Sequence, residues 1–214
     1  MEQLARTAGF LSLRDEIISL ARLQPDDRAL DLGAGTGLLT LAAAPQVSHV
    51  TALDSSFAMC AHLQAKLVFL RHSNVDVVVA GAIKLPLADE SVDVVLSNYC
   101  LHHLNDADKR QALREIWRVL RPCGQVVIGD MMFQLSLGDA RDRALIARFA
   151  KKMLRTGPAG LLRLLKNALR LITGRAEHPA NVGWWHQALK DTGFTEVTVR
   201  ALDHEGGIAL ARRG

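Results

Sequence analysis

The chain has 214 residues, of which 49% are hydrophobic and 22% are charged, and its formal net charge is +4. This composition is ordinary for a globular protein and allows a buried core without disulfides or metals. The three cysteines, Cys60, Cys100 and Cys123, show neither a CxxC pattern nor a zinc-ligand spacing, so we expect reduced thiols and no metal site. No stretch approaches the ~20 apolar residues of a membrane span, and no signal peptide is visible, so we expect a cytoplasmic protein.

Helical and strand-like segments alternate along the first 133 residues. Apolar residues within 1–25 recur near helical spacing, and Pro25 ends this N-terminal helical region. Short apolar runs after it predict strands, and the stretches between most of them predict helices. The expected strands are residues 28–32, 47–53, 75–80, 92–97 and 125–129, and the expected helices are 38–44, 57–72 and 106–120. This alternation predicts parallel βαβ units, and therefore an α/β fold with a doubly wound sheet.

The alternation stops in a basic segment, residues 134–182, which we expect to be a helical insertion. Its stretch 139–178 holds ten Lys or Arg and three Asp or Glu, a local net charge of +7. The basic charge therefore belongs to one segment and not to the whole surface. We expect two helices within 134–175, broken at residues 157–160 by glycine and proline.

The sheet pattern resumes near the C-terminus. We expect a helix at 184–192, ending at Gly193, and strands at 197–202 and 208–211. The five-residue turn between these strands is too short for a crossover connection, so the two strands are expected to be antiparallel.

A glycine-rich loop, Asp31-Leu32-Gly33-Ala34-Gly35-Thr36-Gly37, joins the first expected strand to a helix. Glycines let a ligand approach the main chain, whose free N–H groups point at it from the helix N-terminus. The third glycine comes one residue earlier than the dinucleotide fingerprint requires, and no lysine follows it as in a phosphate-binding loop. Asp31 repels a pyrophosphate but suits a ligand with an ammonium group. S-adenosylmethionine has an α-amine, a sulfonium and no phosphate, so the loop favours it over NAD.

Asp54 ends the second expected strand, 17 residues after Gly37. A carboxylate at this place accepts both hydroxyls of a ribose in dinucleotide sites. An aspartate at a strand end is also a common helix cap. The combination with the glycine loop at this spacing favours the ribose.

Five motifs occur in the order and approximate spacing of a known family. They are Leu30-Asp31-Leu32-Gly33-Ala34-Gly35-Thr36-Gly37, Leu53-Asp54-Ser55-Ser56, the stretch 85–95, Leu101-His102-His103-Leu104 and the stretch 118–124. With them the chain resembles the class I S-adenosylmethionine-dependent methyltransferases, in particular the branch of ubiquinone/menaquinone-type small-molecule methyltransferases. The resemblance implies a Rossmann-like sheet of seven strands, mostly parallel with an antiparallel last strand, plus a helical lid insertion.

We accordingly expect a single methyltransferase domain over residues 1–214. Its four parts are the N-terminal helix region 1–25, the cofactor-binding core 26–133, the basic helical lid insertion 134–182, and the C-terminal helix and strand pair 183–214.

The resemblance also implies which residues hold the cofactor. They are Asp31, Gly33, Ala34, Gly35, Thr36, Gly37, Asp54, Ser55, Gly81, Ala82, Ile83, Ser97 and Asn98. Asp31 faces the amine, Asp54 holds the ribose, and residues 81–83 lie along the adenine. Gly81 stands where this branch usually has an aspartate, so adenine binding has to rest on main-chain groups or another side chain. The implied product is S-adenosylhomocysteine, and no metal is implied.

Methyl transfer from a sulfonium is an in-line displacement, in which positioning supplies much of the acceleration. A base is needed only where the acceptor loses a proton, as a phenol or alcohol does. The catalytic candidates are His103, His102 and Tyr99 at the methyl end, with His186 and His204 further along the chain. The alternative for the histidine pair is a structural role, and Tyr99 either positions the acceptor or packs.

Within the insertion, residues 160–173 show a wide apolar arc beside one polar stripe. Three interpretations are open: a lid over the acceptor site, a peripheral membrane contact, or a subunit contact. A lid of this composition favours an apolar or acidic acceptor. The basic residues are not interleaved with stacking aromatics, which argues against nucleic acid as a partner. The oligomeric state, monomer or homodimer, stays open.

The leading hypothesis is methyl transfer from S-adenosylmethionine to a small, apolar or acidic organic acceptor. The alternatives are a non-catalytic S-adenosylmethionine-binding regulatory protein and an NAD-dependent oxidoreductase. The early third glycine argues against the oxidoreductase.

Overall fold

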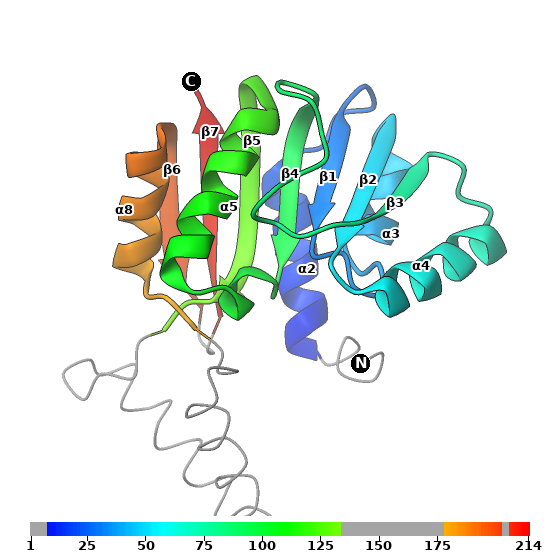
Figure 1. Cartoon of the computed structure of the whole chain (residues 1–214), viewed down its shortest axis with the longest axis horizontal. Coiled ribbons are helices and arrows are strands. Elements are labelled where there is room, and N and C mark those ends of the chain that lie inside the picture. The colour runs from blue at the N-terminus through cyan, green and yellow to red at the C-terminus, as the bar shows by residue number, and fades with distance from the viewer. Residues whose placement is uncertain (1–7, 134–177, 203–205) are drawn as a thin grey trace, which may run out of the picture.

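The computed structural model describes residues 8–133, 178–202 and 206–214 (Figure 1). Their strands form one seven-stranded sheet in the order β3-β2-β1-β4-β5-β7-β6. The strands are β1 Arg28–Leu32, β2 His49–Asp54, β3 Val75–Val79, β4 Val92–Asn98, β5 Leu120–Met131, β6 Phe194–Ala201 and β7 Gly206–Arg213. β1 to β5 pair in parallel, whereas β7 runs antiparallel to both β5 and β6. The expected mostly parallel sheet with an antiparallel last strand is confirmed.

Helices cover both faces of the sheet. They are α2 Ala8–Ala21, α3 Thr40–Ala43, α4 Phe57–Leu70, α5 Asp106–Val119 and α8 Val182–Thr192, with the short 3-10 helices η1 Ala44–Gln46 and η2 Leu101–His103. α5 and α8 lie on one face, and α2 lies on the other (Figure 1). Val95 of β4 packs in the cluster of α5 and α8, whereas its neighbours Val94 and Leu96 pack in the cluster of α2. The strands are apolar throughout because both of their faces are buried.

Several elements differ from the expected boundaries, β5 and α3 among them. The strand expected at 125–129 begins at Leu120, because β4 pairs Val92 with Leu120 and Val94 with Gln125. The residues between these two pairs form a bulge, in which Cys123 has a φ of 64°. The helix expected at 38–44 is α-helical only over Thr40–Ala43 and continues as η1, where Pro45 stands in the first turn.

Several expectations fall on residues outside the described ranges. The structure describes the basic insertion only from His178 onward, so its two expected helices and the stripe at 160–173 lie outside the described residues. The same holds for residues 1–7 and for His204. Among the residues that are described, no helix combines the length and apolar character that crossing a membrane requires.

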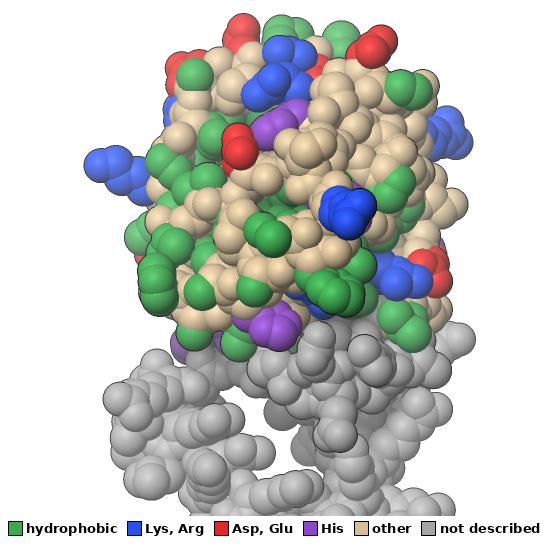
Figure 2. Space-filling view, turned by 90° about the vertical axis from the view of Figure 1, so that its right-hand side faces the viewer, with side chains coloured by type: hydrophobic (Ala, Val, Ile, Leu, Met, Phe, Trp, Pro, Cys, Tyr) green, Lys and Arg blue, Asp and Glu red, His purple; other side chains and the backbone are tan. Residues whose placement is uncertain are grey.

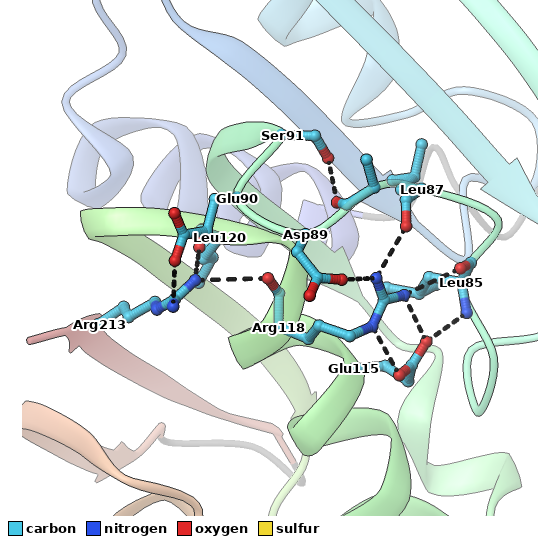
Figure 3. A network of polar contacts seen from close by, with 10 residues as sticks. Leu85, Leu87, Asp89, Glu90, Ser91, Glu115, Arg118, Leu120 and Arg213 are labelled. Carbon is cyan, nitrogen blue, oxygen red and sulfur yellow. Dashed lines mark hydrogen bonds and ion pairs between the residues drawn. The ribbon is translucent and has the colours of Figure 1, made fainter.

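A polar network centred on Arg118 holds the loop between β3 and β4 against α5 (Figure 3). The guanidinium donates to Leu85 O at 3.0 Å and to Leu87 O at 2.8 Å. It also pairs with Asp89 at 2.7 Å and with Glu115 at 2.8 Å, and Glu115 in turn accepts the Leu85 N–H at 2.8 Å. This geometry gives the motif at 118–124 a structural role, because Arg118 donates to two main-chain carbonyls of the loop.

Arg213 extends the network from the opposite side. It pairs with Glu90 at 2.7 Å and also donates to Leu120 O (Figure 3). Its guanidinium stacks 4.0 Å from the ring of Trp117. The last described strand is thereby tied to the start of β5 and to the same loop.

Replacement of Arg118 by alanine is expected to lower the free energy of unfolding by about 2 kcal/mol, because two main-chain carbonyls and two carboxylates lose a charged donor. The hydrogen bonds of Arg118 also hold the pKa of Glu115 below its usual range. A lowered carboxyl pKa stabilises the fold above the unfolded value and ceases to do so as the pH falls. The difference between wild type and variant, measured by urea unfolding, should therefore shrink on acidification.

Arg114→Ala is the matched control. Arg114 is an exposed arginine of the same helix, and its guanidinium donates to Gln111 Oε1. Equal urea midpoints for the two variants at neutral pH would contradict the anchoring role of Arg118.

Candidate functional site

A cavity of about 530 Å³ opens where β1, β2, β3 and β4 end. Parallel strands present their carboxyl ends at one edge of the sheet, which brings distant segments of the chain together there. The predicted site residues that line the cavity are Asp31, Gly33, Ala34, Gly35, Thr36, Asp54, Ser55, Gly81, Ala82, Ile83, Asn98, Tyr99 and His103. Gly37, Ser97, His102 and His186 are the predicted residues in the described part of the chain that do not line it.

Gly37 and Ser97 lie behind the cavity wall. A Cβ at Gly37 would lie 2.4 Å from Leu63 Cδ1, so the missing side chain lets α4 pack against the loop. Ser97 is fully buried and its hydroxyl donates to Leu32 O at 3.0 Å, across the pairing of β1 with β4. Both residues shape the site without facing a ligand.

The glycine loop is positioned by two close approaches. Gly33 has a φ of +78°, and a Cβ there would lie 2.3 Å from Cys100 Sγ, so only glycine lets the loops after β1 and β4 touch. Gly35 has a φ of +51°, but the nearest heavy atom to a Cβ there is Gly33 O at 4.0 Å. A side chain at Gly35 would therefore enter open space at the cavity that this residue lines.

Two buried acceptor oxygens on the cavity wall have no hydrogen-bond partner. Asp31 lies at the end of β1, where its Oδ2 accepts from the Thr40 N–H at 2.8 Å and from the Thr40 hydroxyl at 2.5 Å. Its Oδ1 is unpartnered, as is Oδ1 of Asn98 at the end of the adjacent strand β4. Burial raises the pKa of the Asp31 carboxyl to about 6, although both Thr40 bonds act to lower it and Asp54 adds a smaller rise. A ligand with hydrogen-bond donors at this place would supply partners for both oxygens.

Asp54 joins the glycine loop to the end of β2. Its Oδ2 accepts from the Gly35 N–H at 2.8 Å, and its Oδ1 accepts from the Ser56 N–H at 2.8 Å. Ser56, and not Asp54, is the N-cap of α4, with its hydroxyl accepting from the Met59 N–H at 3.4 Å. Each carboxylate oxygen keeps a further lone pair, so Asp54 can also accept hydroxyl groups from a ligand in the cavity.

The side of the cavity that follows β3 is apolar. Gly81, Ala82 and Ile83 line it together with Ala80 and Met59. A Cβ at Gly81 would meet no heavy atom within 4 Å, so the position is open for a planar group to approach. The side chains on this side of the cavity can pack against a ligand, but they include no carboxylate.

Tyr99, Cys100, His103 and Leu104 line the wall that follows β4. Tyr99 has a φ of 50°, a left-handed conformation that few tyrosines adopt, and its N–H donates to Gly129 O at 2.8 Å. Burial raises the pKa of the Cys100 thiol well above its usual range, so this cysteine is not an activated nucleophile. His103 is exposed at this wall and is the predicted histidine that faces the cavity.

His102 faces away from the cavity, toward a buried carboxylate on β5. Asp130 is fully buried and accepts from His102 Nδ1 at 2.6 Å and from the His102 main-chain N–H at 2.9 Å. The same carboxylate accepts from the Met131 N–H at 2.7 Å. Asp130 thereby holds η2, the short helix that carries His103.

The chain returns from the insertion directly against η2. The His178 N–H donates to His102 O at 2.7 Å, and Nζ of the fully buried Lys109 donates to His178 O at 2.5 Å. Lys109 also pairs with Asp106 at 3.1 Å and lies 5.4 Å from the ring centre of Trp184. Trp184 and the buried Trp185 next to it do not line the cavity, in agreement with plain packing.

Sequence reasoning missed several residues of the site. Cys100, Leu104, Met59 and Ser56 line the cavity. Their position in the sequence could have indicated them, since each stands in one of the motifs or within a few residues of one. Among the described residues, no group of three His, Cys, Asp or Glu side chains could hold a metal ion.

Residues 30–128 match the family model described as Methyltransferase domain. An uncharacterized methyltransferase of Oceanobacillus iheyensis is 32% identical over 120 residues, which make up 56% of this chain and 54% of that protein. The ubiquinone/menaquinone biosynthesis C-methyltransferase of Vibrio vulnificus is 36% identical over 118 residues, 52% of this chain and 44% of that protein. The chain thus spans about half the length of the curated relatives it matches.

The fold has a counterpart among solved structures over nearly its whole length. The crystal structure of an S-adenosylmethionine-dependent methyltransferase from Aquifex aeolicus covers 99% of this chain and 96% of its own, with a TM-score of 0.70. The two sequences are 18% identical, so the likeness is one of fold.

Proposed function

We propose that the chain belongs to the class I S-adenosylmethionine-dependent methyltransferases, binds S-adenosylmethionine in the cavity described above and methylates a small organic acceptor. The observation that carries the proposal is the pair of buried, unpartnered oxygens Asp31 Oδ1 and Asn98 Oδ1 on one cavity wall. A buried acceptor without a donor costs about 1–3 kcal/mol. An ammonium group supplies three donors and a positive charge beside the Asp31 carboxylate, which offsets that cost.

The remaining walls fit the other parts of the same molecule. Asp54, with one lone pair free on each oxygen, is the residue to accept the ribose hydroxyls. The apolar side at residues 80–83 and Met59 fits the adenine ring, with no side-chain carboxylate to meet its amino group. The open space over Gly35 leaves room for the chain between the ribose and the amino acid part.

The bound cofactor supplies a methyl group on a sulfonium, so an electron pair of the acceptor forms the new bond while the carbon–sulfur bond breaks. The protein contributes placement, because positioning alone supplies much of the acceleration of such a displacement. Tyr99 and His103 are the polar side chains of the wall after β4 that can orient an acceptor. His103 is the residue to take a proton where the acceptor carries a hydroxyl.

The acceptor side favours a neutral or acidic molecule over a cationic one. The two carboxylates that line the cavity, Asp31 and Asp54, follow β1 and β2, and the residues lining it after β4 include neither Asp nor Glu. The basic insertion adds a local charge of +7 to the sequence that follows β5. The name of the Vibrio relative, a C-methyltransferase of quinone biosynthesis, supports an apolar organic acceptor.

Calorimetric titration tests the cofactor site. S-adenosylmethionine and S-adenosylhomocysteine should each bind the wild-type protein with a saturable heat, whereas Gly35→Val should give none. The valine occupies the cavity, while its left-handed conformation costs the fold only about 1–2 kcal/mol, so urea unfolding should remain cooperative. Absence of heat with both compounds in the wild-type protein would exclude the proposed site.

Transfer is tested separately with a radiolabelled methyl group. Incorporation of label into a small-molecule extract is expected, and His103→Ala should slow it by roughly tenfold or more if the acceptor has to lose a proton. Saturable binding without transfer into any extract would instead support the non-catalytic, cofactor-binding alternative.

A further inference from the structure

Exposed hydrophobic side chains gather at one edge of the molecule. The large ones in the described part of the chain belong to α4, to the end of β3 or to the loop after it, and they are Phe57, Val68, Phe69, Leu70, Val79 and Ile83. Figure 2 views this edge, where hydrophobic side chains are spread over the surface and are interspersed with a smaller number of charged ones. Phe57 and Phe69 are 76% and 85% exposed, so both rings stand largely in water. A contiguous apolar area of this kind marks an interaction surface.

The exposed side of α4 is mostly apolar and holds two polar residues, His62 and Gln64. Its 14 residues include no Asp or Glu, and its single lysine, Lys66, donates to Thr36 O at 3.0 Å and so points toward the glycine loop. α5 has the same length but begins with the acidic pair Asp106 and Asp108 and carries several arginines. A helix that is apolar all round is normally buried, whereas an ordinary surface helix resembles α5.

The outward side of α4 forms one continuous strip, which we call the α4 face. It consists of the exposed residues Phe57, Ala58, Ala61, His62, Ala65, Val68 and Phe69, of which only His62 is polar. These residues share a side because they recur at spacings of three, four and seven along the helix. The residues between them, Cys60, Leu63 and Leu67, are buried against the sheet.

The α4 face is complementary to itself. If a second α4 lies antiparallel over it with a twofold axis near residue 63, Ala61 meets Ala65 at the centre. Toward each end Phe57 then meets Val68, and Phe69 meets Ala58. Small residues at the centre allow the helix axes to approach to about 8–10 Å, and the large residue of each end pair fills the space beside a smaller one. A twofold interface requires such self-complementarity, because the same patch serves both subunits.

We propose that the chain forms a homodimer through the α4 face, with the two α4 helices packed antiparallel about a twofold axis. The four large residues of α4 expose on the order of 500 Å² of apolar surface, at the upper end of what single chains carry. With the alanines and Val79, the area approaches the roughly 800 Å² that each partner buries in a stable interface. The α4 face carries no Asp, Glu, Lys or Arg, so no permanently charged side chains of like sign oppose two identical surfaces.

The dimer does not depend on methyl transfer, and its interface adjoins the cavity without entering it. Ser55, Ser56 and Met59 line the cavity at the N-terminal end of α4, whereas Phe69 stands about three turns away. A substitution at Phe69 can therefore remove the dimer while cofactor binding remains, so the two proposals fail separately.

Sedimentation velocity of the full chain, from low to high micromolar concentration, tests the proposal. The wild-type protein is expected to sediment at twice the chain mass, and Phe69→Glu at the mass of one chain, since the new carboxylate would be buried against Ala58. Ser19→Glu places the same charge on an exposed position of α2 and should remain dimeric. Circular dichroism and titration with S-adenosylhomocysteine confirm that the glutamate variants are folded.

The antiparallel register has a test of its own. Ala61→Glu and Ala65→Arg should each be monomeric alone, because each places two like charges in the interface. An equimolar mixture of the two should dimerise again, because the introduced carboxylate of one chain then faces the introduced guanidinium of the other. A wild-type chain that sediments as a monomer throughout, including one that binds lipid vesicles instead, overturns the proposal. A dimer that persists in Phe69→Glu, or a mixture that stays monomeric, overturns it as well.

Discussion

Asp31→Asn is expected to weaken the binding of S-adenosylmethionine by about 1.5–3 kcal/mol, roughly 10- to 100-fold, while it stabilises the ligand-free protein. The loss of affinity follows because the ammonium group no longer meets a carboxylate. The gain in stability follows because a buried charge is removed, while an amide oxygen can still accept the two bonds from Thr40. One substitution should thus move affinity and stability in opposite directions.

The sign of the pH dependence is set by the raised pKa of Asp31, which is about 6 in the folded protein. The folded state binds this proton more tightly than the unfolded chain does, where an aspartate titrates near ~3.9. The contribution to stability is therefore full below the unfolded value and is lost as the pH rises through 6, at a total cost of about 2–3 kcal/mol. Cofactor affinity should change in the other direction and increase with pH, because the ammonium group prefers the ionised carboxylate.

Urea unfolding and calorimetric titration at pH 5 and pH 8 separate the two effects. Wild type and Asp31→Asn should differ in stability mainly at pH 8, and the pH dependence of cofactor affinity between these values should disappear in the variant. Asp26→Asn, at an exposed turn position, is the control and should change neither quantity. An Asp31→Asn protein that binds the cofactor as tightly as wild type would remove Asp31 from the proposed site.

Asp130→Ala is expected to destabilise the protein by about 3–5 kcal/mol, the range for removing one member of a buried, hydrogen-bonded pair. Three donors lose their acceptor at once, namely the His102 ring, the His102 main-chain N–H and the Met131 N–H. Asp130 is fully buried, so water does not readily replace the carboxylate. The cost should exceed that of any surface aspartate in the described part of the chain.

The urea midpoint measures this loss, and Asp130→Asn gives a second reading if the alanine variant does not fold. Asparagine keeps one acceptor oxygen but places an NH2 group against a donor, so an intermediate loss is expected. Because Asp130 does not line the cavity, the folded fraction of either variant should bind S-adenosylhomocysteine within a few-fold of wild type. A loss under about 1 kcal/mol for the alanine variant would contradict the assigned role.

Features that are encoded locally were predictable. The apolar runs predicted the central strands, and the short turn before the last strand predicted the antiparallel pairing of β6 and β7. The glycine loop and Asp54 were found because they stand close together along the chain, and the Gly35 N–H donates to the Asp54 carboxylate. The sequence predicted a start of β5 that is too late, at residue 125. The bulge near its start depends on the pairing register with β4, and a single segment of sequence does not contain that register.

Contacts between distant segments were not predictable from a single sequence. In the sequence, Asp130 stands at the end of an apolar strand. No neighbouring residue indicates that its side chain bonds to His102, 28 residues earlier. Ser97 was expected to line the cavity because it stands in the right strand, but its side chain lies on the face toward Leu32. In the sequence, Lys109 is one of several charged residues on a polar helix. In the structure it is buried, and it donates a hydrogen bond to a main-chain carbonyl 69 residues away.

His178 is held against η2 and α5 through its main-chain atoms alone. Its N–H donates to His102 O, and its carbonyl accepts from the Lys109 side chain. Substitution at this position leaves both bonds in place, since neither involves the imidazole. Insertion or deletion between His178 and the start of α8 at Val182 would shift both atoms out of register with η2. Evolution of this segment is therefore free in residue type and constrained in length, so divergence among relatives should accumulate here as substitutions and not as gaps.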